Sequence, residues 1–490
     1  MKFISTRGKS TVESASQAIS QGLANDGGLF VPETFPQVDI SKMLKMDYAS
    51  IACHVLKQFL TEYNETALLT ACENAYAKFE PESPSTVVKI DDNFYILELF
   101  HGPTLAFKDV ALTILPHLLR AGADNIGVKD EILILVATSG DTGKAALEGF
   151  KNQKGIKIMV FYPSEGVSDM QKAQMTTQEG DNVNVVAVKG NFDDCQSAVK
   201  TIFSSKDIAN KLKEKGVILS SANSINFGRL APQIGYYFAT YCMLVNQNEI
   251  NMGDKINFVV PTGNFGNILA GYYAKKMGLP IDKLICASNS NNVLTEFFVS
   301  GTYDKNREFF KTMSPSMDIL ISSNLERLIF EMSGRNAEIT AKRMEELKTV
   351  GNYSITKQEK EEIAKEFYAD YCEEDECLET LSEFFDEFGY LLDTHTSVAV
   401  NVAEKYIGQK GLNTPTVVLS TASPYKFTQN VLKAISGKHE KDAFKACQKL
   451  NEITACPIPV QITELKGKAP RFTKVIDKND IVNEVMDFIK

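Results

Sequence analysis

The stretch Ile132-Leu-Ile-Leu-Val-Ala-Thr-Ser-Gly-Asp-Thr-Gly-Lys144 decides the fold of this chain of 490 residues. Its first part, residues 132–137, is a continuous apolar run, which is typical of a strand buried on both faces of a parallel sheet. A glycine-rich turn follows, and residues 145–150 continue as a helix. Strand, turn and helix in this order predict an anion site at the turn, because exposed N–H groups and the helix start both favour negative charge.

Further units of strand, loop and helix follow along the chain. We expect strands at 158–163, 183–188, 217–219, 256–261 and 417–420, and helices at 168–175, 193–203 and 268–277. Strands that alternate with helices at this spacing form a parallel sheet with right-handed crossovers. The sequence therefore predicts an α/β fold.

Length and composition limit the function. A chain of this size with 44% hydrophobic residues exceeds what one core usually holds, so two or three domains are expected. The net charge of -10 argues against nucleic-acid or membrane surfaces, and leaves room for one local basic pocket. Scattered cysteines without CxxC spacing indicate free thiols, and the five histidines lack the spacing of a zinc site. With no secretory leader and no long apolar span, we expect a cytoplasmic protein.

One lysine has an unusual setting, within Glu98-Leu-Phe-His-Gly-Pro-Thr-Leu-Ala-Phe-Lys-Asp109. Most of the residues around Lys108 are apolar. Desolvation disfavours an ammonium more than a neutral amine, so a lysine in such a setting deprotonates easily, as a Schiff-base nucleophile must. The alternative is a lysine whose stem packs on apolar surface while its charge reaches water.

This lysine segment resembles the cofactor-lysine motif of threonine synthases, which are pyridoxal-phosphate enzymes. Other matches lie at 5–8, 26–32, 137–143, 224–229, 263–267 and 316–327. The resemblance covers nearly all of residues 1–430. It implies a two-lobed parallel-sheet fold like that of the tryptophan synthase β subunit, with an added N-terminal domain and with pyridoxal 5'-phosphate on Lys108.

The expected domains follow from breaks in pattern and from this resemblance. Residues 1–85 form the N-terminal domain, since a Pro- and Ser-bearing run at 81–85 ends a helical region. Residues 86–430 form the catalytic core, with a smaller lobe at about 110–230 and a Glu- and Lys-rich helical insertion at about 336–389 that has no chemistry of its own. Residues 431–490 pack on the core, with a strand-like run at 460–462 and a helix at 481–489.

The turn after residue 137 has three interpretations. It lacks the G-x-x-x-x-G-K-[ST] spacing of a nucleotide-binding P-loop. An ordinary connection between strand and helix is the structural alternative. The resemblance implies that the turn holds the substrate's carboxylate, with these substrate-binding residues: Thr138, Ser139, Gly140, Asp141 and Thr142.

A second glycine-rich turn follows the strand at 256–261. It lacks the G-x-G-x-x-G fingerprint of dinucleotide sites, and its N–H groups at a helix start suit a phosphate dianion. By resemblance, the residues that hold the cofactor phosphate are Gly263, Asn264, Phe265, Gly266 and Asn267. The hydroxyl of Thr421 is expected to lie at the pyridine nitrogen.

The segment 224–229 supplies candidates for the phosphate of the substrate. The planar guanidinium of Arg229 suits phosphate or carboxylate, and the family associates Ser224, Asn226 and Arg229 with this group. The aromatic stripe that follows is expected to be core.

Four residues depart from the family pattern, namely Thr394, Ser397, Ser423 and Tyr425. The last two stand in a turn where relatives carry His and Ala, and which is expected to contact the cofactor ring. His395 is either an ordering element or a catalytic base, and His101 has no assigned role.

The resemblance implies a carbon–oxygen lyase that converts O-phospho-L-homoserine and water to L-threonine and phosphate, the last step of threonine biosynthesis. One alternative is a related lyase that releases phosphate and 2-oxobutyrate from the same substrate. A second alternative is a non-catalytic binding protein on the same fold. A monomer or homodimer acting on a small molecule, without nucleic acid or membrane, is expected.

Overall fold

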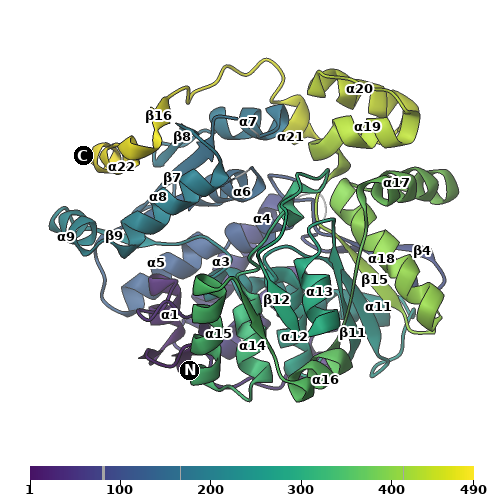
Figure 1. Cartoon of the computed structure of the whole chain (residues 1–490), viewed down its shortest axis with the longest axis horizontal. Coiled ribbons are helices and arrows are strands. Elements are labelled where there is room, and N and C mark those ends of the chain that lie inside the picture. Colours follow the sequence, from purple (N-terminus) through teal and green to yellow (C-terminus); the bar gives the residue numbers. More distant parts are fainter. Residues whose placement is uncertain (80–82, 139, 166, 412, 490) are drawn as a thin grey trace.

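The computed structural model describes residues 1–79, 83–138, 140–165, 167–411 and 413–489. It contains two lobes, each built on its own sheet, with the N-terminal residues packed against both (Figure 1). Among the described residues, no helix is long and apolar enough to cross a membrane.

The smaller lobe has a five-stranded, fully parallel sheet in the order β16-β8-β7-β6-β9. Its strands are β6 (Glu131–Ala137), β7 (Ile156–Pro163), β8 (Val183–Lys189), β9 (Val217–Ser220) and β16 (Val475–Asp477). Alternate residues of β6 enter two different cores, Leu133 on one face and Ile134 on the other. Burial on both faces explains the continuous apolar run, and the first four strands are confirmed.

Helices cover this sheet on both sides. They are α4 (Lys108–Leu112), α5 (Leu115–Asn125), α6 (Asp141–Phe150), α7 (Asp169–Thr176), α8 (Phe192–Ser204) and α9 (Lys206–Glu214). The sequence predicted a helix at 145–150 after the glycine-rich turn, and α6 begins four residues earlier, at Asp141.

The larger lobe has a six-stranded sheet in the order β14-β11-β10-β15-β5-β4, parallel except for β4 at its edge. Its strands are β4 (Thr86–Asp91), β5 (Phe94–Glu98), β10 (Ile256–Pro261), β11 (Ile281–Ser288), β14 (Phe367–Tyr371) and β15 (Thr416–Ser420). Its helices include α10 (Phe227–Leu230), α11 (Pro232–Asn246), α12 (Gly266–Lys276), α13 (Val293–Ser300), α14 (Leu325–Met332) and α18 (Thr394–Lys410). The α/β class with parallel sheets is therefore confirmed.

The N-terminal residues form a small antiparallel sheet and three helices. They are β1 (Phe3–Ser5), β2 (Thr11–Val12), β3 (Phe30–Pro32), α1 (Ala15–Gln21), α2 (Tyr48–Phe59) and α3 (Glu65–Tyr76). Their apolar side chains join the same buried cluster as α5 and α11. Two arginine contacts also tie this part to α14: Arg7 pairs with Glu326 at 2.8 Å, and Arg327 donates to the carbonyl of Phe30 at 3.0 Å.

The segment 336–389 is not only helical. It contains α15 (Ala337–Thr349), β13 (Asn352–Ser354), α16 (Lys357–Glu366), β14 and α17 (Glu374–Phe388). The strand β13 pairs with β12 (Thr302–Asp304), and β14 extends the large sheet along β11. The expectation of a purely helical insertion was wrong, because Glu- and Lys-rich helices on both sides hid the short edge strand.

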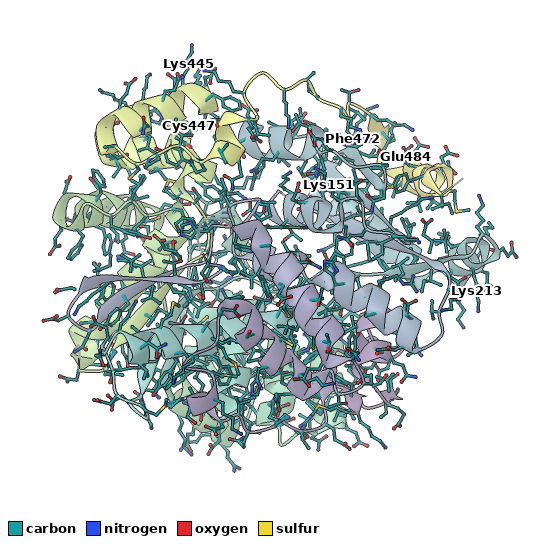
Figure 2. All side chains as sticks on the ribbon, turned by 180° about the vertical axis from the view of Figure 1, so that it is seen from behind. Lys151, Lys213, Lys445, Cys447, Phe472 and Glu484 are labelled. Atoms are coloured by element: carbon teal, nitrogen blue, oxygen red, sulfur yellow. The ribbon has the colours of Figure 1, made fainter. Side chains whose placement is uncertain are left out.

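The C-terminal residues cross from one lobe to the other. They form α19 (Thr428–Ser436), α20 (Ala443–Thr454), α21 (Val460–Thr463), β16 and α22 (Ile481–Phe488). The predicted strand at 460–462 is a helix, because Pro459 provides a helix start and only Ile462 is buried. Figure 2 shows, from behind, the yellow stretch with Phe472 and Glu484 running along the small lobe.

Candidate active site

Lys108 is the first residue of α4, in a segment that lies against the end of β15. The amide of Phe107 donates to the carbonyl of Thr421 at 2.9 Å, and the amide of Ser423 donates to Leu105 at 3.0 Å. Leu105 adopts a left-handed backbone with φ of 61°. The two segments together bring Lys108 and Thr421, which are distant in sequence, to the same edge of the large sheet.

The amine of Lys108 lies in a largely buried, polar setting. Its Nζ is 3.5 Å from Oδ2 of Asp141 and 3.4 Å from Oγ of Ser316, and one tenth of the side chain is exposed. Burial lowers the pKa of Lys108, Asp141 acts against this, and Lys426 and Arg229 lower it further. This environment therefore makes the amine of Lys108 easier to deprotonate than in water, and Lys108 is not a lysine whose charge reaches water.

The turn after β6 is held by its own residues. The hydroxyl of Thr138 accepts from the amides of Gly140 and Gly143, both at 3.0 Å. Gly140 has φ of 153°, and a Cβ there would come within 2.4 Å of the Gln171 side chain. The site residue Ser139 lies outside the described residues. Thr142 is half-buried on α6.

Asp141 has the most connected side chain of the turn. Lys426 pairs with its Oδ1 at 2.7 Å, where Gln171 also donates at 3.0 Å, and Ser316 donates to its Oδ2 at 3.1 Å. Burial alone would raise the pKa of Asp141, but the neighbouring ammonium of Lys426 holds it well below its usual range. The ionised carboxylate faces cations, so an anionic substrate group cannot be held by this side chain and would be held by backbone N–H groups of the turn.

The second glycine-rich turn joins β10 to α12. Phe265 adopts a left-handed backbone with φ of 61°, and α12 begins at Gly266. The carbonyls of Gly263 and Asn264 are occupied, by Ser322 at 2.7 Å and by Asn324 at 3.0 and 3.1 Å. The turn is thereby anchored through its acceptors, which leaves its donors for a ligand.

Asn267 supplies a direct sign of a missing acceptor. Its Oδ1 accepts from the hydroxyls of Tyr236 and Tyr237 at 2.5 and 2.9 Å. Its Nδ2 is buried and has no partner among the described residues. A buried donor without a partner is costly, so this atom fits a ligand oxygen at the start of α12. A phosphate dianion meets that requirement.

The segment 224–229 divides into structural and candidate ligand residues. Asn226 is fully buried, and its side chain caps α10 and donates to the carbonyls of Ile19 and Ser221 at 2.9 Å. Its side chain is thus used within the protein rather than in binding. Ser224 is half-buried, and its Cβ lies 3.6 Å from where a Cβ on Gly266 would stand, so it adjoins the second turn.

Arg229 is a buried cation without an acidic partner among the described residues. Its Nη1 donates to the carbonyl of Ala222 at 2.9 Å, and 6% of the residue is exposed. Burial lowers its pKa to about 10. A buried, unpaired guanidinium is expensive unless an anion joins it. Among the described residues, the guanidinium of Arg229 therefore lacks a counter-charge, which a bound anion would supply.

The ring of His395 links Asp393 to Ser316 through its two nitrogens. Its Nδ1 lies 2.8 Å from Oδ1 of Asp393, and its Nε2 accepts from the amide of Ser316 at 3.1 Å. These contacts place the proton on Nδ1, since Nε2 must accept. The ring therefore positions Ser316, which contacts both Asp141 and Lys108, and this supports the ordering role over the catalytic base.

Within the described part of the chain, the amine of Lys108 makes no hydrogen bond with any of the four residues that depart from the family pattern. Thr394 and Ser397 are buried and donate to the carbonyls of Met313 and Cys377, at 2.7 and 2.6 Å. Ser423 caps the short helix η4 (Pro424–Phe427), and the hydroxyl of Tyr425 donates to the carbonyl of Cys456 at 2.5 Å. None of these contacts involves a predicted site residue.

Ser423 and Tyr425 instead line a cavity of about 480 Å³ beneath the C-terminal segment. His101 lies in its wall, 2.7 Å from Glu98, which also accepts from Tyr390 at 2.6 Å. The residues that line it include Leu105 from the lysine segment and none of the predicted site residues.

Three residues of the site were missed by the sequence. Ser316, Gln171 and Lys426 contact Asp141 from three different parts of the chain. The sequence did offer a reason to suspect Lys426, because this residue lies near the end of the turn that begins at the predicted site residue Thr421. Thr421 itself is buried, and its carbonyl accepts from the amide of Phe107 in the lysine segment.

Comparison with known proteins gives three family matches. The family described as threonine synthase N terminus matches residues 2–76, pyridoxal-phosphate dependent enzyme matches 82–423, and threonine synthase C-terminal matches 396–489. Among individual proteins, threonine synthase of Pseudomonas aeruginosa is 38% identical over 444 residues, which cover 89% of this chain and 91% of that protein.

Two further relatives show the range of the similarity. Human threonine synthase-like 1 is 41% identical over 458 residues, covering 89% of this chain, which spans only 61% of the human protein's length. The crystal structure of pyridoxal-phosphate-bound threonine synthase from Brucella melitensis superposes with a TM-score of 0.89 at 37% identity and covers 100% of both chains.

Proposed function

The chain belongs to the threonine synthase family of pyridoxal-phosphate-dependent enzymes, and from this we propose that it converts O-phospho-L-homoserine and water to L-threonine and phosphate. The observation that carries the proposal is Arg229, a buried guanidinium near Lys108 with no acid of its own. Phosphate released from the substrate is an anion of the kind that such a cation would bind.

Pyridoxal phosphate is the cofactor of this family, and the residues present fit it. We assign Lys108 as its covalent attachment point, the turn 263–267 with the unpaired Nδ2 of Asn267 to its phosphate, and the hydroxyl of Thr421 to its ring nitrogen. When bound, the cofactor supplies an electron sink for charge that develops next to the substrate's amine.

The protein's own groups perform the remaining work. The neutral amine of Lys108 is placed to take and return protons at the substrate carbon beside the amine. The amides of Thr138 and Gly140 already donate within the protein. The backbone N–H groups of Asp141 and Thr142, at the start of α6, therefore hold the carboxylate. Arg229 and Ser224 bind the phosphate that leaves. Lys108 and Arg229 are buried, which limits the access of bulk water, so that a water bound in the site adds to the substrate.

A related lyase that releases phosphate and 2-oxobutyrate is the second candidate. The 41% identity to a protein named threonine synthase-like 1 favours keeping it, because the chain is as similar to that protein as to the threonine synthases. The two activities share every residue assigned above and differ in whether water is added before the product leaves.

One experiment separates the candidates. The protein is incubated with pyridoxal phosphate and O-phospho-L-homoserine, and phosphate, threonine and 2-oxobutyrate are quantified together. We expect one threonine per phosphate. Phosphate with 2-oxobutyrate instead would establish the second candidate, and no phosphate would leave a binding protein on the same fold. Lys108→Ala is the control and should release no phosphate.

A further inference from the structure

Lys426 is the most deeply buried cation of the site. Its side chain is 0% exposed, its Nζ lies 2.7 Å from Oδ1 of Asp141, and it donates to the carbonyl of Thr104 at 2.9 Å. Thr104 belongs to the lysine segment, and it donates to Asp109 at 2.8 Å through its amide and at 2.5 Å through its hydroxyl. Lys426 thus joins the turn after β15, the lysine segment and the start of α6.

The two oxygens of the Asp141 carboxylate face different lysines. Oδ1 accepts from Lys426 and from Gln171, whereas Oδ2 lies 3.5 Å from Lys108 and accepts from Ser316. The pair with Lys426 has the length of a strong charge-assisted hydrogen bond, and the approach of Lys108 does not. One carboxylate therefore has one closely bound ammonium, and it is not Lys108.

We propose that Lys426 is a positioning residue that holds the charge of Asp141 and thereby keeps Lys108 a neutral amine, ready to attach its cofactor. Without Lys426, the buried carboxylate would have Lys108 as its nearest cation, and the two would form an ion pair. With Lys426 in place, a second ammonium would lie among like charges in a site of low dielectric.

The groups that face Lys108 come from four elements. Asp141 lies on α6, Lys426 on η4, Arg229 on α10, and the Ser316 hydroxyl on the short helix η3 (Pro315–Met317). The ring of Phe107 also lies 4.8 Å from its Nζ. Burial, Lys426 and Arg229 lower the pKa of Lys108, and Asp141 raises it. Removing Lys426 should therefore raise it.

The state of the amine decides whether the attachment step can occur. A neutral amine attacks the aldehyde carbon of pyridoxal phosphate through its lone pair, a C=N bond forms, and the aldehyde oxygen leaves as water with the two amine protons. An ammonium has no lone pair and cannot begin this step. The inference rests on the proposed attachment at Lys108, but not on the identity of the substrate.

The test follows attachment and not turnover. Cofactor-free wild type, Lys426→Met and Lys426→Arg are mixed with pyridoxal phosphate at a series of pH values, and the rate of the absorbance change is recorded. Borohydride reduction and peptide mass then locate the modified residue. Lys405→Met is the matched control, because Lys405 pairs with Glu376 at 2.8 Å outside this site.

We expect the midpoint of the pH–rate profile to rise by about one unit or more in Lys426→Met, which is the size of shift that a neighbouring charge produces. Lys426→Arg and Lys405→Met should keep the wild-type midpoint. An unchanged midpoint in a folded Lys426→Met protein would overturn the proposal and leave Lys426 a structural residue.

A second variant covers the case in which Lys426→Met does not fold. Asp141→Asn removes the group that raises the pKa of Lys108, so its midpoint should fall below that of the wild type. A rise or no change would contradict the shared-carboxylate arrangement. Loss of modification in Lys108→Ala separates failure of this inference from failure of the attachment site itself.

Discussion

Arg229 is the candidate ligand for the phosphate of the substrate, because its guanidinium has no acidic partner among the described residues. If it binds the leaving phosphate, Arg229→Met removes charge-assisted hydrogen bonds worth roughly 1.5–3 kcal/mol, so the KM for O-phospho-L-homoserine should rise about tenfold or more. Steady-state kinetics with saturating cofactor measure this. Arg471→Met is the control, since Arg471 donates to the carbonyl of Gly180 at 2.7 Å on the other lobe. An unchanged KM would remove Arg229 from the phosphate site.

Asp109 gives a pH-dependent prediction. Burial raises its pKa from 3.8 to about 6, although Thr104 and Lys426 act against this. Between these pH values the carboxyl of Asp109 keeps its proton in the folded protein and releases it in the unfolded chain. The contribution of Asp109 to the stability of the protein therefore falls as the pH rises through this window. Asp109→Asn cannot titrate.

The free energy of unfolding of Asp109→Asn, relative to wild type, should therefore improve from about pH 4 to about pH 6 and then stay level. Urea unfolding at several pH values measures the difference, in which the groups common to both proteins cancel. A difference that stays level or moves against the variant over this range would show that the carboxylate of Asp109 is already ionised in the folded protein.

Single residues differ in how far the sequence could identify them. Lys108 and Thr421 stand in short local patterns, and the structure places them together, although their roles in binding remain predictions. Asn226 was a candidate ligand residue, and the structure uses it as a helix cap, which sequence alone cannot separate from binding. Gln171 and Ser316 meet Asp141 only in the folded chain, so no spacing could have revealed them.

At the level of elements, helix α18 begins after the N-cap residue Asp393, whose carboxylate accepts several hydrogen bonds. Asp393 accepts from the amides of His395 and Thr396, from the His395 ring, and from the hydroxyl of Thr396. Asp393→Ala removes all of these and should lower the free energy of unfolding by about 2 kcal/mol or more.

The same change should also weaken cofactor attachment, because the freed His395 ring no longer fixes Ser316 beside Lys108. Asp393→Asn keeps one acceptor and should show a smaller loss of stability. Chemical unfolding and the rate of attachment together test this. Loss of stability with unaltered attachment would confine the role of Asp393 to capping α18.

The elements that sequence predicted are those with strong local patterns. Strands such as β6 and β10 are buried on both faces, so their apolar runs are continuous. The edge strands β14 and β16 are short and partly exposed, and each forms because it pairs with a strand that is distant in the sequence. Residues 460–462 show the opposite error, since three residues are too few to separate a strand from a helical turn.

At the level of the whole molecule, the N-terminal residues are packed closely against the rest of the protein. Their apolar side chains share one buried cluster with both lobes, and Glu326 on α14 accepts from Thr6 and Arg7 at 2.6 to 3.0 Å. Glu326→Gln replaces a buried carboxylate that binds three donors, and it should cost about 2 kcal/mol of stability.

Unfolding of the wild type should then occur as one transition for the N-terminal residues and the core together. A fluorescent dye attached at Lys9, which is exposed, reports the unfolding of the N-terminal residues, and circular dichroism reports the unfolding of the whole protein. The two signals should give the same unfolding midpoint, and Glu326→Gln should lower both midpoints equally. An N-terminal signal that melts first would mean that the shared cluster does not couple the two parts.

The strand β16 has a consequence for synthesis of the chain. Residues 475–477 pair with residues 187–189 and cover the outer edge of β8. While a ribosome has made the first four strands of this lobe and not yet β16, the backbone N–H and C=O groups on that edge stay open to any other extended chain. We therefore expect nascent chains on neighbouring ribosomes to associate through this edge more readily until residues 475–477 have emerged and paired with β8.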